Sequence, residues 1–247
     1  GETLFAIATD PEATRNEVSI YYKREPRDQS TLAAYRVGLI EGLYHRMFNQ
    51  RLYELTQLAQ APFLYGYSSQ GRWLRSKEFF ILGAGVSDNG FTVGLEALLT
   101  EAARARQFGF TRSELKRNAK EMLRSMEQAY RERDKSPSSS FASEYVNHLL
   151  ENEPIPGIEK EYELFRRLIP GIELEEVNAL AESWGGEGNR VISIGAPDKE
   201  GLKVPTEESL LAVFAAVGKK QIEPYVEDIS DQPLVPDLPP MTDIADR

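Results

Sequence analysis

The sequence predicts an α+β domain, a two-layer sandwich in which a mixed, mostly antiparallel sheet is covered on one face by helices. The first observation behind this prediction is the order of the expected elements: strands, a helix, strands, a helical run, and then a strand, a helix and a strand. The second is size and composition. The chain has 247 residues, of which 41% are hydrophobic, enough for one large domain with its own core.

The N-terminal part combines one long helix with expected strands on either side of it. Short apolar, β-branched or aromatic runs predict these strands, at 3–8, 17–24, 63–69 and 77–87. Leucines at helical spacing predict the helix over roughly 30–58, with Ser30 as its N-cap. Gly83 and Gly85 in the last of these strands indicate either a bulge or the close approach of another group.

The C-terminal part is mainly helical. Helical periodicity between glycine, proline and capping signals predicts helices at 91–107, 111–134, 139–151, 157–168, 173–184 and 206–217. Strands are expected at 189–196 and near 221–227. Residues 1–229 are therefore interpreted as a single domain. Residues 230–247 are rich in proline and poor in bulky apolar residues, which is typical of an extended linker or tail.

Composition excludes several classes of function. The chain has no cysteine, which excludes disulfides and thiolate metal sites. Its net charge is −10, and its basic residues are interleaved with acidic ones, so nucleic acid is not an expected partner. No apolar run approaches the roughly 20 residues of a membrane-spanning helix.

The residues that could carry chemistry do not form a recognisable catalytic site. The only two histidines, His45 and His148, fall on different expected helices, and neither has a second potential ligand at helical spacing. The chain contains no H-x-x-E-H and no G-x-S-x-G, and nearby carboxylates such as Glu175 and Glu176 are typical of solvated helix faces. We therefore expect neither a catalytic residue nor a bound cofactor in this chain.

One expected strand offers a candidate substrate-binding site. Aromatic, glycine and small polar residues alternate along it, at Leu64, Tyr65, Gly66, Tyr67 and Ser68. If this strand lies at the edge of the sheet, it can add an extended peptide by β-augmentation. The alternative is a core strand whose tyrosines are half buried.

Several stretches, taken together, resemble the pitrilysin/insulinase-type zinc metallopeptidases, the inverzincins. These stretches run from Leu4 to Asp10, from Val18 to Lys23, from Gly42 to Leu52, from Phe79 to Val86, from Thr111 onward and from Pro233 to Pro239. The resemblance covers nearly the whole chain. It implies a LuxS/processing-peptidase-like metallohydrolase fold, and it implies that the chain is one of several related domains of a larger polypeptide.

The resemblance also implies that this domain is inactive. In the family, the active domain carries H-x-x-E-H on its first long helix and a further glutamate later in the chain. If His45 takes the first ligand position, Phe48 replaces the water-activating glutamate and Asn49 replaces the second histidine. Met126 then falls near the third ligand position. These four residues are thus the degenerate positions of a zinc motif.

The expected function is therefore that of a non-catalytic domain of a zinc metalloendopeptidase. It would form part of the proteolytic chamber and anchor a peptide or an unfolded protein on its strand edge, while an adjacent domain holds the zinc. The alternatives are a structural or processing-partner homologue without a proteolytic role, or a free peptide-binding module. An H-x-x-E-H upstream in the parent chain would separate the first interpretation from the second. Bacterial members of the family suggest a periplasmic location.

Overall fold

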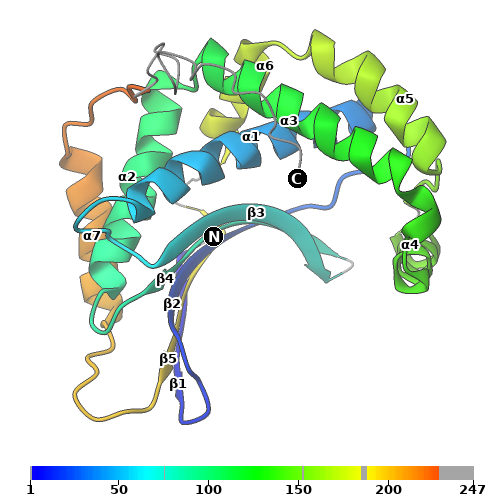
Figure 1. Ribbon diagram of the computed structural model, residues 1–247. Coiled ribbons are helices and arrows are strands. Elements are labelled where there is room, and N and C mark those ends of the chain that lie inside the picture. The colour runs from blue at the N-terminus through cyan, green and yellow to red at the C-terminus, as the bar shows by residue number, and fades with distance from the viewer. Residues whose placement is uncertain (1, 75, 152, 185–187, 228–247) are drawn as a thin grey trace, which may run out of the picture.

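The computed structural model describes residues 2–74, 76–151, 153–184 and 188–227. Within these residues the strands form one five-stranded sheet in the order β1-β5-β2-β4-β3 (Figure 1). The strands are β1 (Leu4–Asp10), β2 (Asn16–Arg24), β3 (Tyr65–Leu74), β4 (Lys77–Val86) and β5 (Arg190–Pro197). β1 and β5 are parallel, and the other pairings are antiparallel. The predicted α+β class with a mixed, mostly antiparallel sheet is confirmed.

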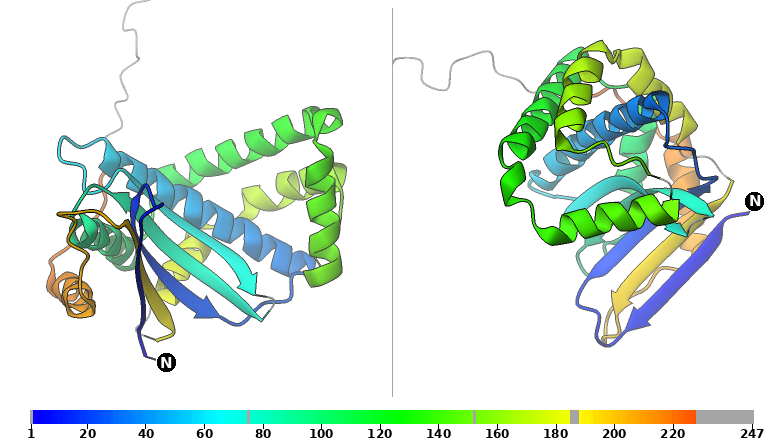
Figure 2. Two further views of the ribbon diagram at one scale, coloured as in Figure 1. Left: turned by 90° about the horizontal axis from the view of Figure 1, so that it is seen from below. Right: turned by 90° about the vertical axis from the view of Figure 1, so that its right-hand side faces the viewer.

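The helices gather on one side of this sheet, as Figures 1 and 2 show. They are α1 (Leu32–Thr56), α2 (Phe91–Phe108), α3 (Arg112–Arg131), α4 (Ser138–Glu151), α5 (Ile158–Leu168), α6 (Leu174–Ser183) and α7 (Glu207–Lys219). Short 3-10 helices follow α3 and α5. A capping box formed by Thr111 and Glu114 begins α3, in agreement with the capping signals that predicted a helix at 111–134.

The core lies between the sheet and the helical layer. Alternate residues of a strand point to opposite faces, and on β4 Phe80 and Leu82 point toward the helices and are buried. From the other side, α1 contributes Leu43, Met47 and Phe48, none of which has any exposed surface. The long apolar face of α1 therefore fixes this helix over the middle and one edge of the sheet.

The glycines of β4 accommodate tyrosines from β3. A Cβ atom at Gly83 would lie 2.5 Å from the ring of Tyr67, and one at Gly85 would lie 2.2 Å from the ring of Tyr65. The close-approach prediction for these glycines is thus confirmed. The bulge alternative is wrong at this place, because the irregularity in strand register falls in β3, between Arg72 and Leu74.

Two local predictions are wrong. The N-cap of α1 is Thr31, whose hydroxyl accepts a hydrogen bond from the Ala34 amide at 3.1 Å, while the Ser30 amide donates to the Asp28 carboxylate instead. The segment 221–227 is not a strand. It is held by its side chains, since Ile222 is buried and Tyr225 packs over α1. The predicted linker at 230–247 lies outside the described residues.

Across the part of the chain that the structure describes, none of the helices is both long and apolar enough to cross a membrane.

Candidate functional site

Two of the predicted motif positions on α1, His45 and Asn49, contact the edge strand β3 at Ser68. Asn49 donates a hydrogen bond from Nδ2 to the Ser68 carbonyl at 3.0 Å, and its Oδ1 accepts one from the Ser68 amide at 2.6 Å. His45 lies one turn earlier, and its Nδ1 shares a hydrogen bond of 2.8 Å with the Ser68 hydroxyl. Two of the predicted motif positions and one predicted strand residue are thus brought together.

β3 is an edge strand, and Asn49 occupies part of that edge. β3 pairs with β4 on one side only. In an antiparallel ladder, successive residues direct their amide and carbonyl groups alternately to one neighbour and then to the other. Because the Ser68 amide and carbonyl both bond to Asn49, Ser68 faces the free edge, and so does Gly66. The Asn49 amide group therefore takes the place of a neighbouring strand at Ser68.

His45 is enclosed by aromatic rings. Its imidazole stacks on Trp184 with ring centres 4.9 Å apart, and Phe80 lies 5.8 Å away. Burial, with a smaller contribution from the positive charge of Arg24, lowers the pKa of His45 from 6.5 to about 4. The imidazole is therefore neutral at pH 7. Its buried Nε2 has no hydrogen-bond partner within the described part of the chain.

The other two motif positions lie apart from this cluster. Phe48 points into the core with no exposed surface and stacks on Tyr44. Met126 is only half buried, one turn beyond Met122 on α3. It is Met122 whose methyl group reaches α1, 2.9 Å from where a Cβ would stand at Gly42. At this contact α3 packs on α1 through the apolar side chain of Met122.

The predicted substrate-binding residues divide between the two faces of the sheet. Leu64 and Tyr65 have 68% and 37% of their surfaces exposed. The Tyr67 hydroxyl donates to Glu17 at 2.9 Å on the face without helices, and Ser68 is buried against α1. The segment lies at the edge of the sheet, and of its two tyrosines Tyr67 is half buried.

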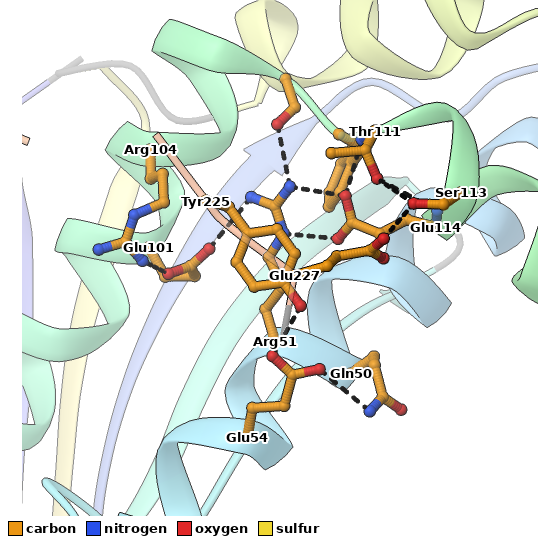
Figure 3. A network of polar contacts seen from close by, with 12 residues as sticks. Gln50, Arg51, Glu54, Glu101, Arg104, Thr111, Ser113, Glu114, Tyr225 and Glu227 are labelled. Carbon is orange, nitrogen blue, oxygen red and sulfur yellow. Dashed lines mark hydrogen bonds and ion pairs between the residues drawn. The ribbon is translucent and has the colours of Figure 1, made fainter. Parts of the chain in front are cut away.

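A second polar cluster lies two residues further along α1, around Arg51 (Figure 3). The Arg51 guanidinium makes two parallel hydrogen bonds to Glu114, at 2.7 and 2.8 Å, and also contacts Glu101 and the Gly109 carbonyl. It stacks between the rings of Phe110 and Tyr225, whose centres lie 4.6 and 4.1 Å from it.

This Arg51 cluster is structural. Arg51, Glu101 and Glu114 are each almost completely buried, and their charges are paired with one another. The bidentate geometry is the strongest form of an arginine–carboxylate contact. Since the cluster joins α1 to the turn between α2 and α3, its role is to hold the helical layer together. Sequence patterns did not reveal it, because its members come from three helices.

The chain is similar in sequence to one known protein and in fold to several solved structures. No family model matches the chain. A protein of Arabidopsis thaliana named zinc protease PQQL-like is 27% identical over 244 residues, which are 99% of this chain and 23% of that protein. The structure of the periplasmic protease PqqL from Escherichia coli superposes with a TM-score of 0.84 at 19% identity, over 99% of this chain and 27% of that one.

One further solved structure shares this fold. A peptidase M16 inactive domain from Pseudomonas fluorescens superposes with a TM-score of 0.51 at 13% identity, over 83% of this chain and 45% of that one. The chain has the fold of pitrilysin/insulinase-type peptidase domains. The predicted resemblance is thereby confirmed. The chain spans about a quarter of the length of the plant protein and of the Escherichia coli structure that it matches.

The similarity to zinc proteases raises the question of whether the predicted motif residues fit a zinc ion, and they do not. The oxygen and the nitrogen of the Asn49 side-chain amide are both hydrogen-bonded to the Ser68 backbone, and the side chain of Phe48 has no atom that can bind zinc. Among the described residues, no three His, Cys, Asp or Glu side chains are grouped so that they could hold a metal ion. The local chemistry is that of a polar bridge between a helix and an edge strand.

Proposed function

We propose that this chain is a non-catalytic domain of a zinc metalloendopeptidase, and that it forms part of the chamber in which another domain cleaves peptides. The observation that carries this proposal is the use of the motif positions for structure. Asn49 fills the edge of β3 at Ser68, His45 is bonded to the Ser68 hydroxyl, and Phe48 completes the core. A phenylalanine cannot activate water, and an amide engaged at both ends cannot bind zinc.

The proposal includes peptide anchoring on the edge of β3 between Leu64 and Ser68. An extended peptide would pair with the outward-facing backbone at Gly66, and the exposed residues Leu64 and Tyr65 directly precede that position. At Ser68 the peptide would have to replace the Asn49 amide. The edge is thus open at Gly66 and closed at Ser68, which limits how far a peptide can pair along the strand.

The orientation of helix α4 supports a position of this chain beside other domains of the same polypeptide. Its polar residues Ser140, Glu144 and Asn147 line a hollow toward α3 and α5. Its large apolar residues are exposed instead, with Tyr145 at 62% and Leu149 at 82%. Figure 2 shows α4 at one end of the helical layer. An amphipathic helix packed only on its own domain would have the opposite orientation.

We infer that another domain of the parent polypeptide covers the apolar side of α4. The matched Escherichia coli structures are longer than this chain, which covers 49% of the first half and 27% of the larger structure. A contiguous apolar surface on one helix is the expected form of a contact between domains.

Amide exchange tests the anchoring part of the proposal directly. The purified chain is titrated with an extended basic peptide, because the net charge of −10 favours cationic ligands. Slower exchange at Gly66 in the presence of the peptide is the expected result. Exchange at Gly66 that stays constant while the peptide saturates the protein would exclude anchoring at this edge and would leave only the structural role.

A further inference from the structure

A cavity of about 620 Å³ lies between α2, α7 and the helix-covered face of the sheet, away from the edge of β3. Figure 1 shows these two helices side by side at one end of the helical layer. Phe80 from β4, Leu99 from α2 and Phe214 from α7 contribute apolar walls, and Trp184 adds its indole ring. Pockets of roughly 300–1,000 Å³ with mostly apolar walls are typical binding sites for small organic molecules.

Three cationic side chains line the same cavity: Arg106, Arg190 and Lys219. Within the described ranges, none of the three has a carboxylate oxygen within 4.0 Å of its charged nitrogens. The neighbouring cation Lys220, for comparison, pairs with Glu96 at 2.8 Å. The cavity therefore collects positive charge that the protein does not itself neutralise.

The polar groups of the cavity are positioned for a ligand. Arg190 donates from Nε to the Thr3 hydroxyl at 2.6 Å, and its guanidinium lies 4.2 Å from the ring centre of Phe214. These two contacts fix the side chain and leave both terminal nitrogens without a partner among the described residues. Tyr22 also lines the cavity, and its hydroxyl likewise has no hydrogen-bond partner among the described residues.

The positive charges of Arg190 and Arg106 both influence the hydroxyl of Tyr22. Burial raises the pKa of Tyr22, and the positive charges of Arg190 and Arg106 partly oppose this rise. Both arginines are therefore within electrostatic reach of one point on the cavity wall. A carboxylate near that point would accept charge-assisted hydrogen bonds from arginine and from the tyrosine hydroxyl.

We propose that this cavity binds an apolar carboxylate, with the apolar part between α2 and α7 and the carboxylate against Arg190 and Arg106. Such a group occurs in two sources, a free fatty acid or the C-terminal carboxylate of a peptide that ends in an apolar residue. The site is separate from the edge of β3, so the proposal does not depend on the function proposed above.

Fluorescence of Trp184 tests the proposal, because the chain has two tryptophans and a Trp73→Phe background leaves Trp184 as the reporter. The probes are decanoate, decanol and acetate, together with an acetylated peptide ending in Phe-Leu and its C-terminal amide. Saturable binding of decanoate or of the free-acid peptide is expected, with decanol, acetate and the amide binding much more weakly. The stronger of the two acids identifies the source. Equal affinity for decanoate and decanol, or no saturable binding of either acid, would overturn the proposal.

Substitutions of residues that line the cavity test whether the ligand binds there. Loss of a charge-assisted hydrogen bond in Arg190→Gln should weaken decanoate binding about tenfold or more. Gly218→Leu should also abolish binding, because Gly218 lines the cavity with open space where a Cβ would stand, and leucine favours the helical state of α7. Lys116→Gln, on exposed α3 surface, is the matched charge control and should bind normally. Unchanged affinity in a folded Gly218→Leu variant would contradict the assigned site.

Discussion

The side-chain amide of Asn49 forms a two-way hydrogen-bonded contact with the backbone of Ser68, donating at 3.0 Å and accepting at 2.6 Å. A residue that the sequence resemblance assigns to a degenerate zinc-ligand position thus takes the place of a neighbouring strand. Exposed strand edges are prone to pair with other chains, and proteins commonly protect them. Asn49 provides such protection at one point of β3.

Replacement of Asn49 by alanine should loosen this edge. Asn49→Ala leaves the Ser68 amide and carbonyl without partners, and we expect a loss of about 1–3 kcal/mol in the free energy of unfolding, measured by urea denaturation. The same variant should bind an extended peptide more tightly, because the peptide no longer has to displace the Asn49 amide.

Gln50→Ala is the control for this experiment, since Gln50 is exposed on the same turn of α1. Asn49→Asp is a graded variant that can accept from the Ser68 amide but cannot donate to the Ser68 carbonyl. A peptide affinity that falls in Asn49→Ala would show that Asn49 assists pairing at the edge.

The buried imidazole of His45 should make stability depend on pH. The folded-state pKa is lowered to about 4, below the value of 6.5 in an unfolded chain, so the unfolded state binds more protons between these two values. Stability is therefore lost as pH falls through this window, by about 2 kcal/mol between pH 7 and pH 5 from this residue alone. Urea denaturation of the native chain and of His45→Gln at both pH values measures the difference.

A proton NMR titration checks the same property at the level of the residue. The His45 ring resonances should titrate near pH 4, and exposed His148 provides a second set of histidine signals in the same spectrum. A midpoint near 6.5 for His45 would contradict the buried, stacked arrangement with Trp184 and Phe80.

The buried Arg51 cluster should be sensitive to loss of its cation. Arg51→Met leaves the Glu114 carboxylate buried and unpaired, whereas Glu101 keeps its contact with Arg104. We expect a loss of about 3–5 kcal/mol in the free energy of unfolding. Adding Glu114→Gln removes the uncompensated charge and keeps an acceptor for the Thr111 amide, so the double variant should regain most of that stability.

Arg131→Met is the matched control for the cluster, since Arg131 pairs with Glu127 on the exposed surface and should change stability by less than about 1 kcal/mol. If Arg51→Met proves no more harmful than Arg131→Met, the cluster does not hold the helical layer together.

The apolar side of α4 should be dispensable for the stability of the isolated chain. Leu149 has 82% of its surface exposed, and we expect Leu149→Glu to change the free energy of unfolding by no more than about 0.5 kcal/mol. Leu98→Glu, at a fully buried position on α2, should prevent stable folding. Strong destabilisation by Leu149→Glu would mean that this side of α4 packs on its own domain, contrary to the inferred contact with another domain.

Local sequence patterns predicted most of the elements, because their periodicity and capping signals are local. The capping box at Thr111 and Glu114 and the long apolar stripe of α1 are examples. The expected strand at 221–227 failed because side-chain contacts such as that of Tyr225 with Arg51 hold this segment extended without a strand partner. Alternation of residue types cannot distinguish a strand from a segment that is held only by its side-chain contacts.

The sequence named candidate site residues, but it could not give the contacts between them. The positions of His45 and Asn49 followed from the family motif, whereas their shared partner Ser68 and the stacking of Trp184 depend on how α1 crosses β3. The three cations that line the cavity between α2 and α7 are Arg106, Arg190 and Lys219. They come from α2, β5 and α7, so no sequence motif could have grouped them.

Zinc content together with peptidase activity tests the central proposal most directly. The tag-free chain is incubated with zinc, separated from free metal, and analysed for bound zinc and for cleavage of unstructured peptides with and without a chelator. The structure predicts far less than one zinc per chain and no chelator-sensitive cleavage, because Asn49 and Phe48 are committed to structure. One tightly bound zinc per chain with cleavage that the chelator abolishes would contradict a non-catalytic role.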